Sequence, residues 1–516
     1  MKKIIAAVFL SLPASAWSLT VSVYHTSDVH GWYFSRPAKW DKQNSTRTIG
    51  GFPALSALVK ADKNPHILLD SGDTFQGTPE GTMTKGLATA KLMSQLGYSA
   101  AEVGNHDYDY TEPNLKAVIA ASGFPWLGAN VYVASTGAHV DYLKPYTVVT
   151  VAGKRIAVIG IAGRHTATST LPANVAHLEF RDEAAEAAKW ADEVRKTEHP
   201  DAVIVLAHVG FGGNFFAPTD VSTWTFTDEQ TAGGTLPIAR ASRADVVIGG
   251  HNHAAMLKGW RDPQSGALIA ESYFGLTNVS KIDLTFDDRT GRLTGVSDTL
   301  VPLWTDVTGE DPAVLATLKG FSEQVDKEMG AVIGESAVDL GPSKAGLDSD
   351  IGNWFADAMR RQSGADVALQ NTAGIRSDLK KGPVRVRDIF QIMPFENTLV
   401  KLTMTGDQLK RLMEDNLKGG FSKLQVSGMK VTFRKTDKGA EVVKLERGGA
   451  EIRPDEELTV ATNNYLTTGG TGGQVFSEAR KSEDSMRPIR ELLLKDIKEN
   501  PVKAAPEGGR IVRLDR

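Results

Sequence analysis

The stretch Ile67-Leu68-Leu69-Asp70-Ser71-Gly72-Asp73-Thr74-Phe75-Gln76-Gly77 decides how this chain folds. Its first part is a short apolar run bounded by Pro65 and Gly72, which is typical of a buried strand. Asp73 follows the carboxyl end of that strand, where open α/β sheets place their ligands. A single aspartate there is more often a turn residue that hydrogen-bonds its own backbone. Further stretches of the same kind are therefore needed to indicate a site.

Four more apolar runs end in side chains that can bind a metal ion. They are residues 21–30, 101–107, 203–208 and 246–253, which supply Asp28, His30, Asn105, His208, His251 and His253. Five such coincidences are hard to explain as buried core histidines. We expect these side chains at one edge of one predicted sheet, and we interpret them as a dinuclear metal centre bridged by Asp73.

Length and composition bound the remaining possibilities. At 516 residues the chain is too long for one ordinary domain. A hydrophobic content of 41% and a charged content of 23% are typical of a soluble globular protein. The formal net charge of −4 gives no excess of positive charge, which argues against a nucleic-acid partner. An anionic substrate would be attracted by local metal charge instead.

Residues 1–16 have the pattern of a secretory signal peptide. Lys2 and Lys3 precede an apolar run up to Leu12, and Ala14-Ser15-Ala16 is a small-residue cleavage site. The apolar run is too short to span a bilayer, so we expect no membrane anchor. The mature protein is expected in the periplasm or secreted. The sequence contains no cysteine, so no disulfide can stabilise it.

Strand-like and helical segments alternate up to about residue 300. The strand-like runs lie near residues 20–25, 66–70, 100–103, 146–151, 155–161, 202–207, 245–249 and 280–286, and clear helices lie at 86–97 and 182–197. This alternation predicts a layered α/β domain. All eleven histidines lie at or before His253, so the metal chemistry is expected there. Residues 32–49 are expected to form a surface loop over the site.

A second domain is expected to follow a helix at residues 310–329. Its expected helices are 350–363, 406–416 and 487–499, and its expected strands are 366–370, 429–434, 441–446 and 511–514. We expect the domains to span residues 19–305 and 332–516, with a linker helix at 306–331.

The predicted ligands mix imidazole, carboxylate and amide groups. Such a set suits Mn²⁺ or Zn²⁺ without deciding between them. Two ions ~3.5–4 Å apart clamp a phosphoryl group and lower the pKa of a bound water, which then attacks phosphorus.

Together the motifs resemble those of a known family. The first blocks are Asp28-Val29-His30, Gly72-Asp73-Thr74, Gly104-Asn105-His106-Asp107, His208 and Gly249-Gly250-His251-Asn252-His253. This set resembles the calcineurin-like metallophosphoesterases. With the C-terminal motifs, the chain resembles the secreted bacterial 5′-nucleotidase / UDP-sugar hydrolase family over nearly its whole mature length. The resemblance implies an α/β fold: a layered β-sandwich metallophosphoesterase domain flanked by helices, and a second α+β substrate-binding domain.

The resemblance also implies roles for individual residues. One ion would be bound by Asp28, His30, Asp73 and His253, and the other by Asp73, Asn105, His208 and His251. His106 and Asp107 resemble the catalytic pair, in which His106 stabilises charge on the phosphate or leaving group and Asp107 orients its ring. The remaining histidines are expected to pack or face solvent, with supporting roles open only for His25 and His165.

The second domain would select the substrate, according to the same resemblance. Asn371-Thr372-Ala373-Gly374-Ile375-Arg376 resembles the family's Asn-Gly-Gly-Gly-Ile-Arg block, and Arg376 would bind phosphate or a carboxylate. Phe395 and Tyr465 would form the walls of a base-stacking slot, and Asn397 would hydrogen-bond the base. Stacking contributes about 1–3 kcal/mol per base. Thr471 stands where the family usually has a ribose-binding Asp, and residues 341–346 lack the arginine that relatives often supply.

Three interpretations of function follow. The first is an exported dimetal phosphohydrolase acting on nucleotides, of the 5′-nucleotidase, UDP-sugar or cyclic-nucleotide hydrolase type. The second is a dimanganese thiosulfohydrolase of the bacterial sulfur-oxidation type, against which the Phe395 and Tyr465 pair argues, since a sulfur carrier has no base to stack. The third is a non-catalytic periplasmic binding protein, which predicts the loss of a ligand or of His106, and none is lost.

Overall fold

The computed structural model describes residues 18–38, 40–170, 172–212, 217–342, 346–395, 397–468 and 472–515. The predicted signal peptide and Thr471 lie outside these described residues. The chain divides into two compact units, one ending at Ser322 and the other beginning at Glu323. Each unit is described by itself.

The first unit contains two six-stranded sheets. One has the order β16 (Leu293–Pro302), β15 (Asn278–Asp287), β1 (Ser18–Thr26), β4 (His66–Asp70), β5 (Tyr98–Glu102) and β6 (Trp126–Leu127). The other has the order β13 (Trp260–Arg261), β14 (Leu268–Glu271), β12 (Val246–Gly249), β11 (Ala202–Ala207), β9 (Lys154–Ile161) and β8 (Tyr146–Val151). The central strands β1, β4, β5 and β6 run parallel, as do β9, β11, β12 and β14.

The two sheets pack face to face because their central strands are apolar on both faces. Alternate residues of β11 belong to different cores: Ile204 and Leu206 face the core between the sheets, whereas Val203 and Val205 face the helices. Every residue of β11 is buried. By contrast, β15 pairs antiparallel with β16 and alternates between buried and partly exposed positions along most of its length.

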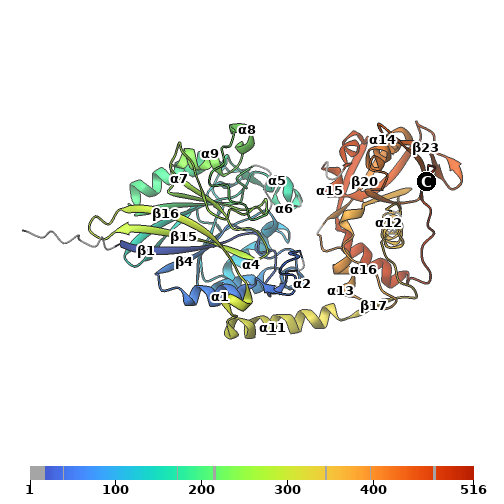
Figure 1. Ribbon diagram of the computed structural model, residues 1–516. Helices are drawn as coiled ribbons and strands as arrows, with labels where there is room; N and C mark the ends of the chain where they lie inside the picture. Colours follow the sequence, from blue (N-terminus) through green and yellow to red (C-terminus); the bar gives the residue numbers. More distant parts are fainter. Residues whose placement is uncertain are drawn as a thin grey trace, which may run out of the picture. The chain divides into compact units, whose positions relative to one another are not determined.

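Helices cover both outer faces of the sandwich (Figure 1). On the side of the β1 sheet, α1 (Phe52–Ala61), α3 (Leu87–Leu96) and α4 (Glu112–Ala121) contribute to one core. On the other side, α7 (Glu183–Thr197) and α9 (Thr235–Ser242) pack on the β11 sheet. The resulting helix–sheet–sheet–helix order confirms the predicted layered α/β fold class.

The second unit is built on the five-stranded sheet β21-β18-β25-β20-β26. Its strands are Leu424–Ser427, Val367–Asn371, Glu457–Asn463, Thr398–Thr405 and Lys481–Pro488. One face packs on α12 (Asp350–Ser363), α13 (Val386–Ile392) and α16 (Ile489–Glu499). The other packs on α14 (Gly406–Leu417) and the four-stranded sheet of β24 (Ala450–Glu451), β23 (Gly439–Arg447), β22 (Lys430–Thr436) and β27 (Ile511–Arg513). This is the predicted α+β arrangement.

Shorter elements complete the chain. They are β2 (Arg36–Pro37), β3 (Thr48–Ile49), α2 (Pro79–Met83), the 3₁₀ turn η1 (His106–Tyr108), β7 (Val131–Val133), α5 (Thr166–Ser169), α6 (Pro172–Val175), β10 (Leu178–Phe180), α8 (Asp228–Thr231), α10 (Thr305–Thr308), β17 (Val332–Ser336), η2 (Thr372–Gly374), β19 (Gly382–Arg385), α15 (Asn464–Thr467) and η4 (Gln474–Glu478). The predicted helix at 310–329 is α11 (Pro312–Met329). Among the described residues, none of the helices is both long and apolar enough to cross a bilayer.

Candidate metal centre

The predicted ligands follow the carboxyl ends of five parallel strands. Asp28 follows β1, Asp73 follows β4 and Asn105 follows β5, all in one sheet. His208 follows β11, and the segment with His251 and His253 follows β12, in the other sheet. The prediction of one sheet was therefore wrong: two facing sheets meet at this edge. Uniformly apolar strands indicate burial on both faces but not which sheet a strand joins.

The backbone of this edge is strained. Twelve described residues other than glycine have positive φ, and five of these are predicted ligands: Asp28, His30, Asp73, His251 and His253, with φ between 48° and 75°. Side chains with a Cβ rarely adopt this left-handed region, and residues held there cluster at functional sites. The turns re-aim each side chain across the sheet edge toward its neighbours.

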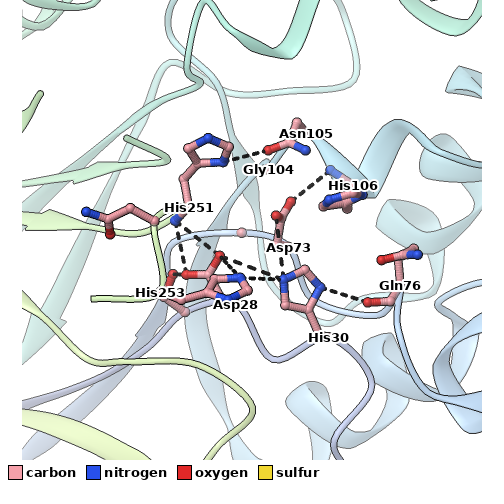
Figure 2. Close-up of polar contacts among 12 residues, drawn as sticks. Asp28, His30, Asp73, Gln76, Gly104, Asn105, His106, His251 and His253 are labelled. Atoms are coloured by element: carbon pink, nitrogen blue, oxygen red, sulfur yellow. Dashed lines mark hydrogen bonds and ion pairs between the residues drawn. The ribbon is translucent and has the colours of Figure 1, made fainter. Parts of the chain in front are cut away.

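Asp28, His30 and His253 form the first cluster (Figure 2). His30 Nε2 lies 3.0 Å from His253 Nε2 and 4.0 Å from Asp28 Oδ1, and His253 Nε2 lies 3.6 Å from the same carboxylate oxygen. The Nδ1–H of His30 donates to the carbonyl of Gln76 at 2.8 Å. That bond leaves the lone pair on Nε2, facing the other two side chains.

His208, His251 and Asn105 form the second cluster, on the other side of Asp73. The side-chain oxygen of Asn105 is 3.0 Å from His251 Nδ1. The amide group of Asn105 donates to the carbonyl of Ser169 at 3.1 Å, which turns the oxygen toward the cluster. The Nδ1–H of His208 donates to the carbonyl of Ser71 at 2.6 Å, so its Nε2 is again free to act as a ligand.

Asp73 joins the two clusters. Its Oδ2 lies 3.1 Å from His208 Nε2 and 3.9 Å from His30 Nε2, while its Oδ1 accepts the backbone N–H of His106 at 2.8 Å. Burial opposes ionisation of Asp73, but the rings of His208 and His106 outweigh it and hold its pKa well below the usual range. Asp73 is therefore a carboxylate at neutral pH, as a bridging ligand must be.

A cation fits the chemistry of this donor set. His208 is fully buried, and its Nε2 has no hydrogen bond among the described residues although it lies beside the Asp73 carboxylate. Burial lowers the pKa of His208, but Asp73 outweighs it and raises that pKa to about 9, so without a cation the positive charge beside the buried carboxylate is a proton on His208. A divalent cation between the two groups can take the place of that proton. Nitrogen and oxygen ligands at these separations are the surroundings that divalent cations take.

The segment around Asp73 leaves no room for a side chain at Gly104. A Cβ there would lie 2.2 Å from Asp73 Oδ1 and 2.4 Å from the Asp73 backbone nitrogen. Only glycine allows the segment after β5 to pass this close to the bridging carboxylate.

The predicted pairing of Asp107 with the His106 ring was wrong. His106 Nδ1 lies 2.7 Å from the carboxylate of Asp109 instead. The Asp107 carboxylate is fully buried and accepts the backbone N–H groups of Asp73, Thr74 and Gly104 at 2.8–3.0 Å. Adjacent residues of a turn point in different directions, whereas residues three apart on a 3₁₀ turn lie on one face. This spacing of three is the signal that could have identified Asp109.

The ring of His106 is partly exposed beside the first cluster. Its side chain is 34% exposed, and its centroid is 5.5 Å from that of His30. Burial disfavours the charged ring, but Asp109 and Asp73 outweigh it and raise the pKa of His106 to about 10. His165 also enters the centre: its ring stacks on His251 with centroids 3.7 Å apart. The sequence left only a supporting role open for His165, because this residue lies outside every motif.

The predicted substrate residues all lie in the second unit. Phe395 and Tyr465 are 40% and 43% exposed, and the guanidinium carbon of Arg376 lies 6.0 Å from the centroid of the Phe395 ring. Asn397 donates to Asn464 Oδ1 at 3.0 Å, so it ties the Phe395 segment to the residue beside Tyr465.

Asn371 is placed differently. It is 7% exposed, and its side-chain oxygen accepts from Asn463 Nδ2 at 2.8 Å, which makes it a link between β18 and β25. Phe421, which sequence reasoning did not single out, is 50% exposed. It adjoins Ser422, whose carbonyl accepts the hydroxyl of Thr372 in the Arg376 block at 3.2 Å. The glycine pair before Phe421 is the signal for such an exposed loop.

Two family models match the chain. The model of calcineurin-like phosphoesterases matches residues 21–255, and the model of the 5′-nucleotidase C-terminal domain matches residues 332–478. The first match contains every predicted metal ligand. Calcineurin-like phosphoesterases bind divalent metal ions, and the His and Asp cluster described above is the candidate site for them.

Individual proteins are similar along most of the chain. The trifunctional nucleotide phosphoesterase protein YfkN of Bacillus subtilis is 27% identical over 95% of this chain, which spans only 34% of that protein. The 5′-nucleotidase of Vibrio cholerae is 27% identical, with 90% of each chain covered. Among solved structures, a 5′-nucleotidase precursor from Thermus thermophilus is 26% identical, with a TM-score of 0.66 and coverage of 96% of this chain and 100% of its own.

Proposed function

Since this chain belongs to the calcineurin-like phosphoesterases that carry a 5′-nucleotidase C-terminal domain, we propose that it hydrolyses nucleotide phosphate esters with two divalent cations. The observation that carries the proposal is the convergence of ionised Asp73 with His208 Nε2 on one side and His30 Nε2 on the other. Relatives whose names state a nucleotide phosphoesterase or a 5′-nucleotidase activity support the substrate class.

Two groups of residues would hold the cations. The first comprises Asp28, His30, Asp73 and His253, and the second comprises Asp73, Asn105, His208 and His251. The mixed nitrogen and oxygen donors favour Mn²⁺ or Zn²⁺. When bound, such a pair of cations neutralises charge on a phosphoryl group and lowers the pKa of a water molecule.

His106 would act on the substrate itself. Its Nδ1 is held by Asp109, so its Nε2–H points away from that carboxylate and can donate to a phosphate oxygen or to the leaving oxygen. Asp109 keeps the ring protonated and fixes its plane. Asp107 has a different role, because it accepts three backbone N–H groups and thereby holds the turn that carries Asp73.

The second unit would recognise the nucleoside. The exposed rings of Phe395, Tyr465 and Phe421 offer flat apolar faces for a base. The guanidinium group of Arg376 is also exposed and can bind an anionic group through two hydrogen bonds. Thr471, outside the described residues, would offer a hydroxyl where relatives usually have a carboxylate. These features favour nucleotides over simple phosphate esters.

Phosphate release from purified residues 17–516 with added Mn²⁺ or Zn²⁺ tests the proposal. The substrates are AMP, UMP, ATP, a UDP-sugar, a 2′,3′-cyclic nucleotide and p-nitrophenyl phosphate. We expect nucleotide turnover, reduced about 10²- to 10⁴-fold in His106→Ala. No turnover of any phosphate ester by protein that holds two ions would refute the proposal and favour the thiosulfohydrolase alternative, which a thiosulfonate substrate then tests.

Matched variants test the nucleoside site separately. Phe395→Ala, Phe421→Ala and Tyr465→Ala are each expected to raise KM for nucleotides if that ring stacks on the base, while turnover of p-nitrophenyl phosphate stays unchanged. Val443→Ala removes an equally exposed apolar side chain of the same unit and serves as the control. Export follows from the predicted signal peptide, and cell fractionation tests it.

A further inference from the structure

His165 lies at the start of a segment that wraps the second cluster, residues 163–170. It precedes α5, and the carbonyl of Ser169 in that helix accepts the amide group of Asn105. The hydroxyl of Thr170 donates to Asp109 at 2.8 Å, the carboxylate that holds His106. The segment therefore supports both a proposed ligand and the proposed proton donor, and His165 is its one imidazole.

The ring of His165 packs flat against His251. The centroids are 3.7 Å apart and the planes are inclined by 28°. The centroid of His208 is 6.1 Å away, and the three residues offer nitrogen atoms within 4.8 Å of one another. Gly163 makes this pose possible, because a Cβ there would lie 2.1 Å from His165 Cε1.

Distance alone would make His165 a metal ligand, but orientation argues against it. An imidazole binds a metal in its own ring plane, at ~2.0–2.1 Å from nitrogen. Stacked rings whose centroids are 3.7 Å apart and whose planes are inclined by 28° have planes that meet only ~7 Å from the rings, far beyond that reach. The stacked rings of His165 and His251 therefore cannot both bind one ion. A nitrogen of His165 lies within 4.8 Å of nitrogens of His208 and His251, so it would be within reach of a group held by a cation bound to those two residues.

His165 also has unused hydrogen-bonding capacity. Its Nε2 is buried and has no hydrogen-bond partner among the described residues. A buried polar atom without a partner is costly, and such atoms in native structures commonly await a ligand, ion or water. The proposed substrate would bring phosphate oxygens, which accept hydrogen bonds, to this cluster.

We propose that His165 binds the substrate phosphate: it stacks on His251 and donates a ring N–H to a phosphate oxygen held at the second cation position. This proposal rests on the proposed dimetal phosphohydrolase function and adds a phosphate contact from outside the family's motif blocks. The stack fixes the ring plane, so little freedom is lost when the hydrogen bond forms.

Three variants separate hydrogen bonding from packing. His165→Phe retains a flat ring for the stack but removes the donor. His165→Gln removes the ring but keeps a donor, and His165→Ala removes both. His66→Phe is the matched control, because His66 lies at the opposite end of β4 from Asp73 and bonds the carbonyl of Asn64.

Two measurements are made on the purified metal-loaded proteins: ions per chain by elemental analysis, and inorganic phosphate affinity by isothermal titration. For His165→Phe we expect about two ions per chain and phosphate binding weakened about 10- to 150-fold, the effect of losing one hydrogen bond to a charged group. His165→Gln should recover part of that loss, and His66→Phe should match the wild type.

The other outcomes are equally informative. Wild-type phosphate affinity in His165→Phe, with ions lost only in His165→Ala, would show that the ring merely packs and overturns the proposal. Loss of one ion in His165→Phe would make His165 a ligand and also overturns it. Wild-type protein that binds no ions would overturn the proposed function itself, and this phosphate contact with it.

Discussion

Replacing Asp109 by Asn removes the negative charge beside His106, the proposed proton donor, while keeping the shape of the Asp109 side chain. The Asp109 carboxylate, 9% exposed, lies 2.7 Å from His106 Nδ1 and accepts the hydroxyl of Thr170 through its other oxygen. An asparagine fits the same space. Its single oxygen can serve only one of these two donors, and it carries no charge.

The size of the effect follows from the bond that is lost. A hydrogen bond to a charged group contributes about 1.5–3 kcal/mol, and each 1.36 kcal/mol is tenfold in rate, so kcat/KM should fall about 10- to 150-fold. The pH profile should move as well. Asp109 is the leading cause that raises the pKa of His106 to about 10, against the effect of burial. Without that charge the pKa falls, so the protonated ring is lost at lower pH and the alkaline limb of activity shifts downward.

The assay is kcat/KM for AMP between pH 6 and pH 10, with ions per chain measured on the same samples. Bound cations oppose protonation of His106, so the tested quantity is the difference between variant and wild type. Asp107→Asn is the comparison. It should lose ions and thermal stability, because Asp107 holds the backbone of the Asp73 turn. A wild-type profile for Asp109→Asn, beside an Asp107→Asn that keeps its ions but shifts its alkaline limb, would refute the reasoning.

Three further predictions concern the ions, the crowded turn and the core. Removal of divalent ions by a chelator should abolish activity and lower the melting temperature. Free ion at 100 times its Kd should restore about 2.7 kcal/mol of unfolding free energy per site. An unchanged melting curve would contradict the proposed centre. Gly104→Ala should displace Asp73, since its Cβ would lie 2.2 Å from that carboxylate, and so reduce ion content, whereas Gly320→Ala on α11, with open space around it, should bind ions normally. Leu206→Ala, between the two sheets and fully buried, should lower the free energy of unfolding in urea by about 2–5 kcal/mol and, because the sandwich holds the ligand turns, should also weaken ion binding by the folded protein.

Local patterns predicted the elements of this chain better than their assembly. The run before Asp73 and the run 202–207 match β4 and β11, because buried parallel strands are short and continuously apolar. The division of these strands between two sheets could not be predicted, since both faces of each strand are apolar. Asp109 was missed, and His165 was left only a possible supporting role, for a related reason. Their contacts depend on side-chain direction in a 3₁₀ turn and on a stack between segments far apart in sequence, and neither is encoded as a motif.

The strained backbone at the ligands connects the fold to the proposed chemistry. Each left-handed residue costs of order 1–3 kcal/mol, and it persists only when its surroundings determine it. Here the surroundings are the core between two sheets, whose strands are buried up to the residues where the turns begin. The rigid sandwich can therefore hold Asp28, Asp73 and His251 in conformations that local propensity disfavours. Asp28 and His251 are 223 residues apart in sequence, yet the backbone N–H of His251 donates to the Asp28 carboxylate at 3.1 Å. Mutations that loosen the sandwich should therefore reduce ion affinity before they unfold the protein.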